Sequence, residues 1–317
     1  MSRLLPPVLA AAVVVGATQL SAQEISVTLL GTGDPTPTIE RFGPATLVEA
    51  GGHQMLFDVG RGASLRLTQA GVRIGGIDEV FITHFHHDHL NGMTDLWMTA
   101  WLPPAYGRRS EPWRVYGPTG TADILAGLRQ AMEPNIRIRI ADEQLPAAGA
   151  EFDVTEFFED GVVFDEDGVV VTAFAVDHGE VIKPAYGYRV DYNGYSVVIS
   201  GDTRFDENII TMSEGVDLII HEVVAARDEL LDFDPRIQLI IDHHTTPEQA
   251  GVVFERAAPR LAAYTHYVLL SGPNVPEVTI DDVIERTRTT YSGPLQAGED
   301  LMRFEIGETI EVIPFNR

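Results

Sequence analysis

Four histidines and one aspartate fall within the six residues from His84 to His89. A β-branched run precedes this segment and a stretch with helical spacing follows it, so we expect the segment to begin where a strand ends. There His84 and His86 can point the same way, while the next turn lets Asp88 and His89 face a second point close by. Imidazole and carboxylate ligands without thiolate suit Zn²⁺, with Mn²⁺ or Fe as substitutes. The spacing therefore predicts a metal centre.

A surface histidine tract that binds metal adventitiously is the alternative interpretation. The flanking strand and helix favour a metal centre, because a functional motif requires that structural context. Cysteine is absent from the chain, which excludes disulfides, thiolate metal ligands and a cysteine nucleophile. His53 and His87 fit no ligand position, and we expect neither to take part in the chemistry.

Short strand-like runs recur along the chain and are punctuated by Gly, Pro or Asp. The expected strands cover residues 25–30, 45–49, 54–59, 80–83, 113–116, 169–176, 186–191, 195–200, 217–220 and 261–265. The expected helices cover residues 63–70, 93–101, 121–132, 247–257 and 281–289. One α/β domain over residues 23–317 is the simplest organisation, since no repeat of fixed period and no long Gly/Ser linker divides the chain.

The first 22 residues have the pattern of a secretory signal peptide. Arg3 precedes an apolar stretch from residue 4 to residue 15, and small residues end the segment at Ser21 and Ala22. A membrane anchor is the alternative, but the apolar stretch is shorter than the ~20 residues that a spanning helix needs. We therefore expect residues 1–22 to be removed, leaving a periplasmic or secreted protein that is not held in a membrane.

Acidic residues outnumber basic ones by 47 to 22, which gives a formal net charge of −25. A surface with this balance repels phosphate backbones and anionic lipid, so the charge predicts that nucleic acid is not a partner. Residues 141–168 contain ten acidic residues and no Lys or Arg, which we interpret as a solvated acidic insertion. Calcium binding is the alternative there, but the ligand spacing of an EF-hand loop is missing.

The segment His84-Phe85-His86-His87-Asp88-His89 resembles the signature His-x-His-x-Asp-His of the metallo-β-lactamase superfamily. Gly-Thr-Gly-Asp-Pro-Thr-Pro at residues 31–37 and Phe-Asp-Val-Gly at residues 57–60 resemble one branch of it, that of transfer-RNA 3′-processing endonucleases (ribonuclease Z) and zinc-type arylsulfatases. The resemblance implies a four-layer αββα sandwich of the α/β class, with two metal ions at one edge between the sheets.

The resemblance also implies the remaining metal ligands. His178 falls where the third ligand of the first ion belongs, Asp202 where a bridging carboxylate belongs, and His266 completes the second site. The implied sets are His84, His86, His178 and Asp202 for one ion, and Asp88, His89, Asp202 and His266 for the other. A shared carboxylate holds such ions ~3.5–4 Å apart, close enough to clamp a hydroxide between them. We therefore expect two Zn²⁺ ions.

Two further motifs resemble those of the RNA-processing branch. His221-Glu222 is similar to its His-Glu-Ala-Thr motif, and His244-Thr245-Thr246 to its His-Ser-Thr motif. By this resemblance Glu222 would orient His244 to protonate a departing alkoxide or phenoxide, a contribution of roughly 10²–10⁴-fold. Asp88 would orient the attacking hydroxide. The alternative for His244 is a polar residue that merely precedes a helix cap.

These observations favour an exported two-metal hydrolase of small phosphate or sulfate esters, similar to arylsulfatases and phosphodiesterases. Ribonucleases Z bind transfer RNA through a basic, glycine-rich arm, and we expect the acidic residues 141–168 to replace it here. A lactonase or β-lactamase, a ribonuclease Z-type endonuclease and a metal-binding scaffold with a vestigial site are the alternatives. We also allow for a homo-oligomer.

Overall fold

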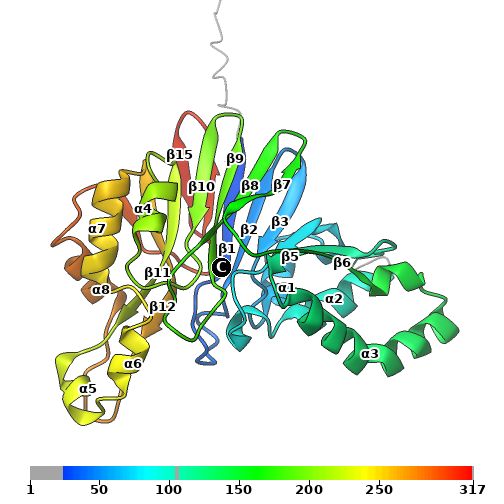
Figure 1. Ribbon diagram of the computed structural model, residues 1–317, viewed down its shortest axis with the longest axis horizontal. Helices are drawn as coiled ribbons and strands as arrows, with labels where there is room; N and C mark the ends of the chain where they lie inside the picture. Colours follow the sequence, from blue (N-terminus) through cyan, green and yellow to red (C-terminus); the bar gives the residue numbers. More distant parts are fainter. Residues whose placement is uncertain (1–23, 104–106, 316–317) are drawn as a thin grey trace, which may run out of the picture.

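The computed structural model describes residues 24–103 and 107–315. Figure 1 shows two β-sheets packed face to face, with helices on the outer face of each sheet. These four layers confirm the αββα sandwich that the sequence predicts. The predicted signal peptide, residues 1–22, lies outside the described residues.

The strands of the first sheet are β1 (Ile25–Gly31), β2 (Ala45–Ala50), β3 (His53–Phe57), β4 (Glu79–Phe81), β5 (Trp113–Pro118), β6 (Phe152–Phe157), β14 (Arg303–Ile306) and β15 (Ile310–Ile313). Their order is β15-β14-β1-β2-β3-β4-β5-β6. Those of the second are β7 (Gly161–Glu166), β8 (Val169–Ala175), β9 (Tyr186–Tyr192), β10 (Tyr195–Ile199), β11 (Leu218–Ala225), β12 (Leu261–Leu269) and β13 (Leu295–Gln296). Their order is β13-β12-β11-β10-β9-β8-β7.

Helices cover both outer faces. The first sheet is covered by α1 (Ala63–Gln69), α2 (Met93–Trp101) and part of α3 (Thr121–Glu143), and the second by α4 (Glu207–Met212), α7 (Pro247–Ala257) and α8 (Ile280–Thr287). Two short helices, α5 (Asp228–Phe233) and α6 (Ile237–Ile241), form a lobe that projects from the sandwich (Figure 1). Among the described residues, no helix combines the length and the apolar character that a membrane crossing requires.

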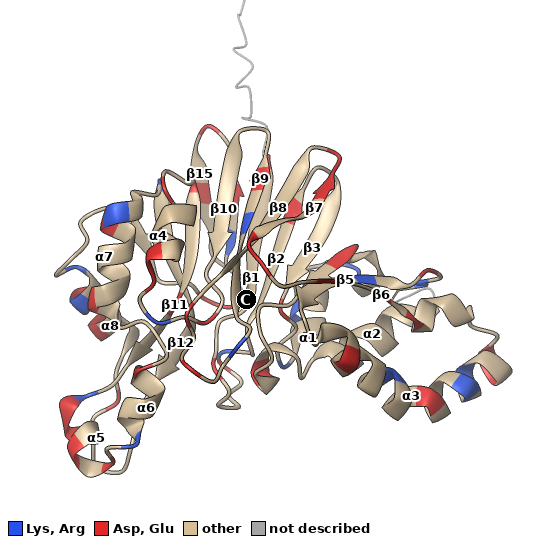
Figure 2. Cartoon of the chain, viewed as in Figure 1, with Lys and Arg blue, Asp and Glu red and all other residues tan. Residues whose placement is uncertain are grey.

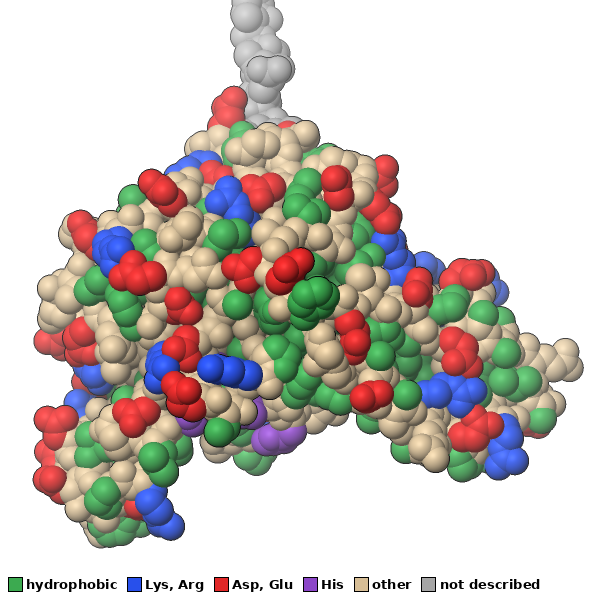
Figure 3. Space-filling view, viewed as in Figure 1, with side chains coloured by type: hydrophobic (Ala, Val, Ile, Leu, Met, Phe, Trp, Pro, Cys, Tyr) green, Lys and Arg blue, Asp and Glu red, His purple; other side chains and the backbone are tan. Residues whose placement is uncertain are grey.

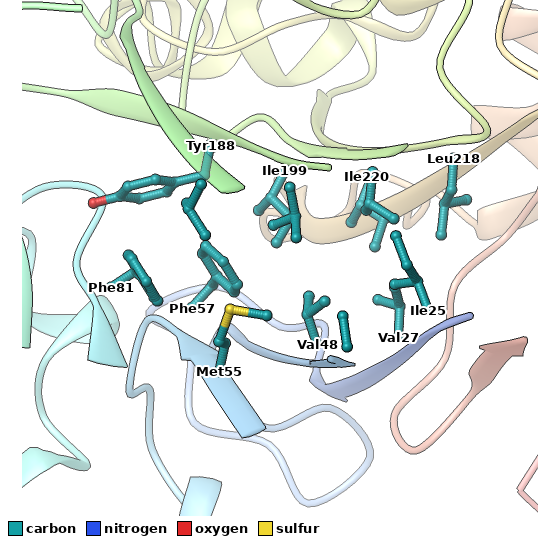
Figure 4. Packing of buried hydrophobic residues seen from close by; sticks show 14 of the residues in the cluster. Ile25, Val27, Val48, Met55, Phe57, Phe81, Tyr188, Ile199, Leu218 and Ile220 are labelled. Atoms are coloured by element: carbon teal, nitrogen blue, oxygen red, sulfur yellow. The ribbon is translucent and has the colours of Figure 1, made fainter. Parts of the chain in front are cut away.

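The main core lies between the two sheets. Successive side chains of a strand point to opposite faces, and Ile25 and Val27 of β1 thus enter the same layer. Figure 4 shows the side chains of Phe57 and Phe81, from the first sheet, lying opposite Tyr188 of the second. The Phe57 and Phe81 rings stack with centroids 4.8 Å apart, and the Tyr188 ring meets that of Phe57 edge-on at 5.3 Å. These contacts fix one sheet against the other.

Strand direction brings the expected site residues to one edge of the sandwich. Strands β3, β4 and β5 are parallel to one another, and so are β10, β11 and β12. The carboxyl ends of parallel strands lie at the same edge of a sheet, where ligand-binding residues gather in α/β folds. His84 follows β4, and His178 and Asp202 follow β8 and β10. Both sheets therefore contribute to one site.

Helix α3 is longer than the sequence predicts. We expected it to end at residue 132. Pro134 lies just beyond that end, and a proline inside a helix removes a backbone donor. Instead α3 continues to Glu143. The buried side chain of Ile136 anchors the part beyond the proline in the outer core, and Arg139 pairs with Glu143 one turn apart at 2.7 Å. Packing and ion pairing beyond Pro134 thus accompany the continuation of the helix past the lost hydrogen bond.

The acidic stretch of residues 141–168 is not an insertion, contrary to our expectation. It includes β6 and β7, which are edge strands of the two sheets, and the turn between them carries the chain from one sheet to the other. Side chains such as Asp153 and Glu156 are exposed, as expected. Charged side chains on an edge strand oppose edge-to-edge association with other sheets, which gives this acidity a structural role.

We predict that Phe57→Ala lowers the free energy of unfolding by about 3–5 kcal/mol, because it leaves a cavity between the two sheets. Phe158→Ala is the matched control, since the Phe158 side chain is 78% exposed and its loss should change the free energy by less than about 0.5 kcal/mol. Urea unfolding followed by circular dichroism measures both. Equal losses in the two variants would contradict the placement of Phe57 in the main core.

Candidate metal centre

The structure brings the predicted ligands of the first ion together. His84 and His86 follow β4, His178 follows β8 and Asp202 follows β10. One potential ligand atom from each of these four residues lies within 4.8 Å of the others. Asp88, His89 and His266 form a second such group, in which His266 belongs to β12. The first group contains all four residues implied for one ion, and the second contains three of the four implied for the other.

Asp202 lies between the two groups, where a bridging ligand belongs. Its Oδ2 atom is 3.7 Å from Nε2 of both His84 and His178, which belong to the first group. The same oxygen is 3.2 Å from Nε2 of His89 and 3.4 Å from Nε2 of His266, which belong to the second. The Asp202 side chain is only 3% exposed. A single buried carboxylate oxygen thus faces imidazole nitrogens of both sites.

Two ligand histidines are oriented by hydrogen bonds at the nitrogen that faces away from the centre. Nδ1 of His84 is 3.0 Å from Oγ1 of Thr83, and Nδ1 of His178 is 2.7 Å from the carbonyl oxygen of His243. Such outer partners fix the ring and leave Nε2 for the metal. Nδ1 of His86 lies 3.3 Å from Nε2 of His178, so His86 presents Nδ1, and not Nε2, to the same point.

Asp58 is an outer partner of His89. One of its carboxylate oxygens is 2.7 Å from Nδ1 of His89 and also accepts the Thr83 hydroxyl at 2.8 Å. The other accepts the backbone N–H of Thr83 at 2.9 Å. Asp58 has φ of 59°, a left-handed conformation in which aspartate is one of the commoner non-glycine residues. Asp58 lies in the motif at residues 57–60 that resembles the family. That resemblance alone did not indicate that its carboxylate contacts a ligand histidine.

The residues present fit a pair of divalent ions. Nε2 of His84 and Nε2 of His89 are buried and have no hydrogen-bond partner among the described residues. A buried polar atom without a partner is costly, and both atoms face the shared carboxylate of Asp202. Together the two groups offer five imidazoles and two carboxylates without thiolate, a donor set typical of Zn²⁺, Mn²⁺ or Fe. Bound metal would satisfy these nitrogens.

Burial keeps the first group ready to bind metal. It lowers the pKa of His84 well below its usual value and that of His178 to about 3. Burial also lowers the pKa of His86. These imidazoles are therefore neutral at pH 7, and neutral imidazole is the form that coordinates metal.

The second group carries protons when no metal is bound. Burial lowers the pKa of His266, but the Asp202 and Asp88 carboxylates outweigh it and raise that pKa to about 9. Burial also lowers the pKa of His89, but the Asp202 and Asp58 carboxylates outweigh it and raise that pKa well above its usual value. Metal binding at this group must displace those protons.

Glu222 and His244 adjoin both groups. β11 extends through Ala225, so Glu222 lies within a strand and not in the loop that we expected after residue 220. Its Oε2 is 3.2 Å from Nδ1 of His244, and its Oε1 accepts the backbone N–H of Thr245 at 2.8 Å. His244 also forms a group with Asp202 and His266 in which potential ligand atoms lie within 4.8 Å. His244 is therefore directed at the centre.

Other candidates lie outside the site. The His87 side chain is 70% exposed. His53 contacts Glu79 and Asp167, and it lies at the start of β3, away from the strand ends that carry the metal centre. His221 is buried, and its Nδ1 is 2.7 Å from the backbone carbonyl of Glu222, which makes its role structural.

The centre opens at the lower surface of the molecule in the view of the figures. Histidine side chains gather there in Figure 3, between the lobe of α5 and α6 and the projecting part of α3. Figure 2 shows that acidic residues predominate on α5, whereas α3 carries both signs of charge. The opening is thus flanked by two projections and is not covered by a basic surface.

Comparisons with known proteins agree with this geometry. A sequence profile of the β-lactamase superfamily domain matches residues 53–267. The Ribonuclease Z of Mycobacterium sp. (strain KMS) is 35% identical over 292 residues, which are 92% of this chain and 99% of that protein. The Ribonuclease Z of Mycobacterium marinum (strain ATCC BAA-535 / M) is 34% identical over 283 residues, covering 89% and 99%.

Solved structures show the same fold. The metallo-β-lactamase fold protein YhfI from Bacillus subtilis has a TM-score of 0.68 at 18% identity, and the match covers 88% of this chain and 98% of that one. The short form of human tRNase Z has a TM-score of 0.65 at 24% identity, with the same coverage.

The expectation that nucleic acid is not a partner is wrong, because the relatives are named for a nuclease that acts on RNA. The net charge of −25 is an average over the whole surface, whereas the charge that a substrate meets at a metal centre is set by the ions held there. An acidic exterior therefore does not exclude a polyanionic substrate. The chain belongs to the metallo-β-lactamase superfamily of metal-dependent hydrolases and, within it, to the ribonuclease Z branch.

Proposed function

We propose that the chain is a two-metal phosphodiesterase that cleaves RNA in the manner of a ribonuclease Z. The observation that carries the proposal is the Glu222–His244 pair, with 3.2 Å between Oε2 and Nδ1, directed at the bridging carboxylate of Asp202. A buried pair of this kind supplies a proton to a basic leaving group, such as the alkoxide released from a phosphodiester. The relatives favour this endonuclease alternative over the arylsulfatase that we expected from sequence.

The side chains divide the work as follows. Two bound divalent ions would supply Lewis acidity toward the ester and activate the attacking water. Although burial raises the pKa of Asp88, its hydrogen bond from His266 outweighs this and lowers it, so Asp88 is ionised and can orient that water through its carboxylate. On the other side, His244 donates a proton from Nε2 to the departing oxygen while Glu222 holds Nδ1. Both side chains are nearly buried, which excludes competing water.

A panel of substrates tests the proposed reaction. We would compare an RNA that carries a 3′ trailer with an aryl phosphodiester, an aryl sulfate, a lactone and a cephalosporin, using zinc-loaded protein. Endonucleolytic cleavage of the RNA at the highest kcat/KM is the expected result. Turnover of the aryl sulfate alone would contradict the proposed RNA cleavage and support a hydrolase of small esters.

We predict that the protein binds two zinc ions and that Asp202→Ala weakens both sites, because the shared oxygen is lost. His266→Ala should weaken mainly the second. Asp153→Ala, which removes an exposed carboxylate on β6, is the control and should bind both ions normally. Metal analysis after dialysis against a weak chelator measures all three. Two ions retained by Asp202→Ala would show that the ligand assignment is wrong.

We predict that the affinity of the second site falls as pH drops below about 9, the pKa of His266. Below that pH the imidazole is protonated in the metal-free protein, so each displaced proton costs up to about tenfold in affinity per pH unit. The first site should change far less between pH 9 and 6, because the pKa of His178 is about 3. Zinc titrations across this range would contradict the account if both sites weakened equally.

We predict that His244→Ala slows phosphodiesters with alkyl leaving groups far more than those with nitrophenolate, which departs without a proton. Glu222→Gln should show the same selectivity, and the double variant should be little worse than either single one, because the two act as a unit. His53→Ala is the control, since His53 lies at the start of β3 and contacts the start of β4, away from the metal centre. If the variants lost activity equally toward both leaving groups at unchanged metal content, His244 would have a structural role and not act as a general acid.

We further propose that the chain is exported after removal of residues 1–22. The support is the order of Arg3, an apolar stretch and a small-residue end in the sequence. Intact-mass measurement on protein from the native host tests it, with a mature chain beginning near residue 23 as the expected result. A chain that retains the whole segment would contradict export and leave the proposed reaction unchanged.

A further inference from the structure

His266 differs from three of the other histidine ligands of the centre in how its ring is held. His84, His89 and His178 each have an outer partner at Nδ1. Nδ1 of His266 is buried and has no hydrogen-bond partner among the described residues. The backbone of His266 has φ of 42°, a left-handed conformation that is uncommon for a residue with a side chain. The position of this ligand must therefore be set by its backbone neighbours.

The backbone next to His266 is attached to the first sheet. The N–H of Tyr267 donates to the carbonyl oxygen of Thr32 at 3.0 Å, which joins β12 to the residue that follows β1. The guanidinium of Arg41 stacks over the Tyr267 ring at 4.4 Å and donates to the Thr32 hydroxyl at 2.6 Å. Thr32 is fully buried. The placement of His266 thus depends on the placement of Thr32.

Asp300 holds Thr32 in turn. One oxygen of its carboxylate accepts the backbone N–H of Thr32 at 2.9 Å and the Thr32 hydroxyl at 2.8 Å. The other accepts the backbone N–H of Phe42 at 2.8 Å and two guanidinium donors of Arg66, at 2.8 and 3.1 Å. The Asp300 and Arg66 side chains are 5% and 8% exposed. One buried carboxylate therefore fixes both ends of the segment between Thr32 and Phe42.

We propose that Asp300 is a positioning residue for the second metal site, acting on His266 through Thr32 and Tyr267. The proposal rests on the two-metal function proposed above. Because an outer hydrogen bond at a ligand typically contributes 10–100-fold to metal affinity, a chain of contacts that replaces such a bond should have a comparable effect. Asp300 belongs to neither group of potential metal ligands, so its action is on ligand geometry.

A purely structural ion pair would behave differently, and the chain offers one for comparison. Asp217 pairs with Arg260 at 2.6 Å and accepts the backbone N–H of Ser196 at 2.7 Å. Asp217 precedes β11, at the end of the second sheet opposite the metal centre. Asp217→Asn should therefore lower stability, as Asp300→Asn should, without changing the position of His266 or the zinc affinity of its site.

The test measures zinc affinity of the full chain by competition with a chromophoric chelator, for the wild type, Asp300→Asn and Asp217→Asn. We expect Asp300→Asn to bind one of the two ions about 10–100-fold more weakly and the other normally. Asp217→Asn should bind both as the wild type does. In a His266→Ala background, Asp300→Asn should cause no further loss, because both changes act on the same ligand.

Thr32→Val keeps the inference testable if Asp300→Asn does not fold. It removes the hydroxyl that donates to Asp300 and accepts from Arg41, and it should weaken binding of the same ion by a smaller factor. Unchanged affinity in Asp300→Asn or Thr32→Val, or equal weakening in Asp217→Asn, would overturn the positioning role alone. A wild-type chain that binds fewer than two zinc ions would overturn the two-metal site and the inference with it.

Discussion

The arrangement of the site depends on one buried oxygen, Oδ2 of Asp202. It lies 3.2–3.7 Å from an imidazole nitrogen of each of four histidines. A carboxylate without water around it is stable only when opposite charges or metal ions compensate it, so the surrounding side chains must bring such charges to this point. Histidines from both sheets face this oxygen. His89 from the first sheet and His266 from the second carry protons when no metal is bound, because their pKa values are raised. His84 and His178 are neutral and offer ring nitrogens to a metal ion.

Because the ligands come from both sheets, the geometry of the site depends on the contacts that hold one sheet against the other. The aromatic stack of Phe57 and Phe81 against Tyr188 lies just before the loops that carry the first ligands. Across the gap, the Tyr188 hydroxyl donates to the carbonyl oxygen of Ile82 at 2.5 Å. A ligand set divided between sheets tolerates little sliding, since a metal site needs its donors in place to a few tenths of an ångström.

The ligands could be predicted from sequence because their spacing follows local geometry. A strand end followed by a tight turn presents His84 and Asp88 to neighbouring points, whatever the rest of the fold does. The single residues His178, Asp202 and His266 were found through resemblance and their order in the chain. The outer partners were not found: Asp58 and Asp300 act on residues 25 or more positions away, and no local pattern reveals such contacts.

Other differences also arise from tertiary structure. Pro134 is a valid local stop signal, yet packing of Ile136 carries α3 past it. We interpreted residues 141–168 as an insertion because of their acidic side chains. Strand pairing in β6 and β7 depends on backbone hydrogen bonds, which that side-chain charge does not reveal. Net charge misled in the same way about nucleic acid, since an average over the surface does not describe the field at a metal centre.

The central claim is that two metal ions share Asp202. X-ray absorption spectroscopy of the zinc-loaded protein measures the distance between them directly. The account predicts a zinc–zinc distance of about 3.5–4 Å with nitrogen and oxygen neighbours, and loss of that zinc–zinc signal in Asp202→Ala. A spectrum with no second zinc within about 4 Å in the fully loaded wild type would contradict it.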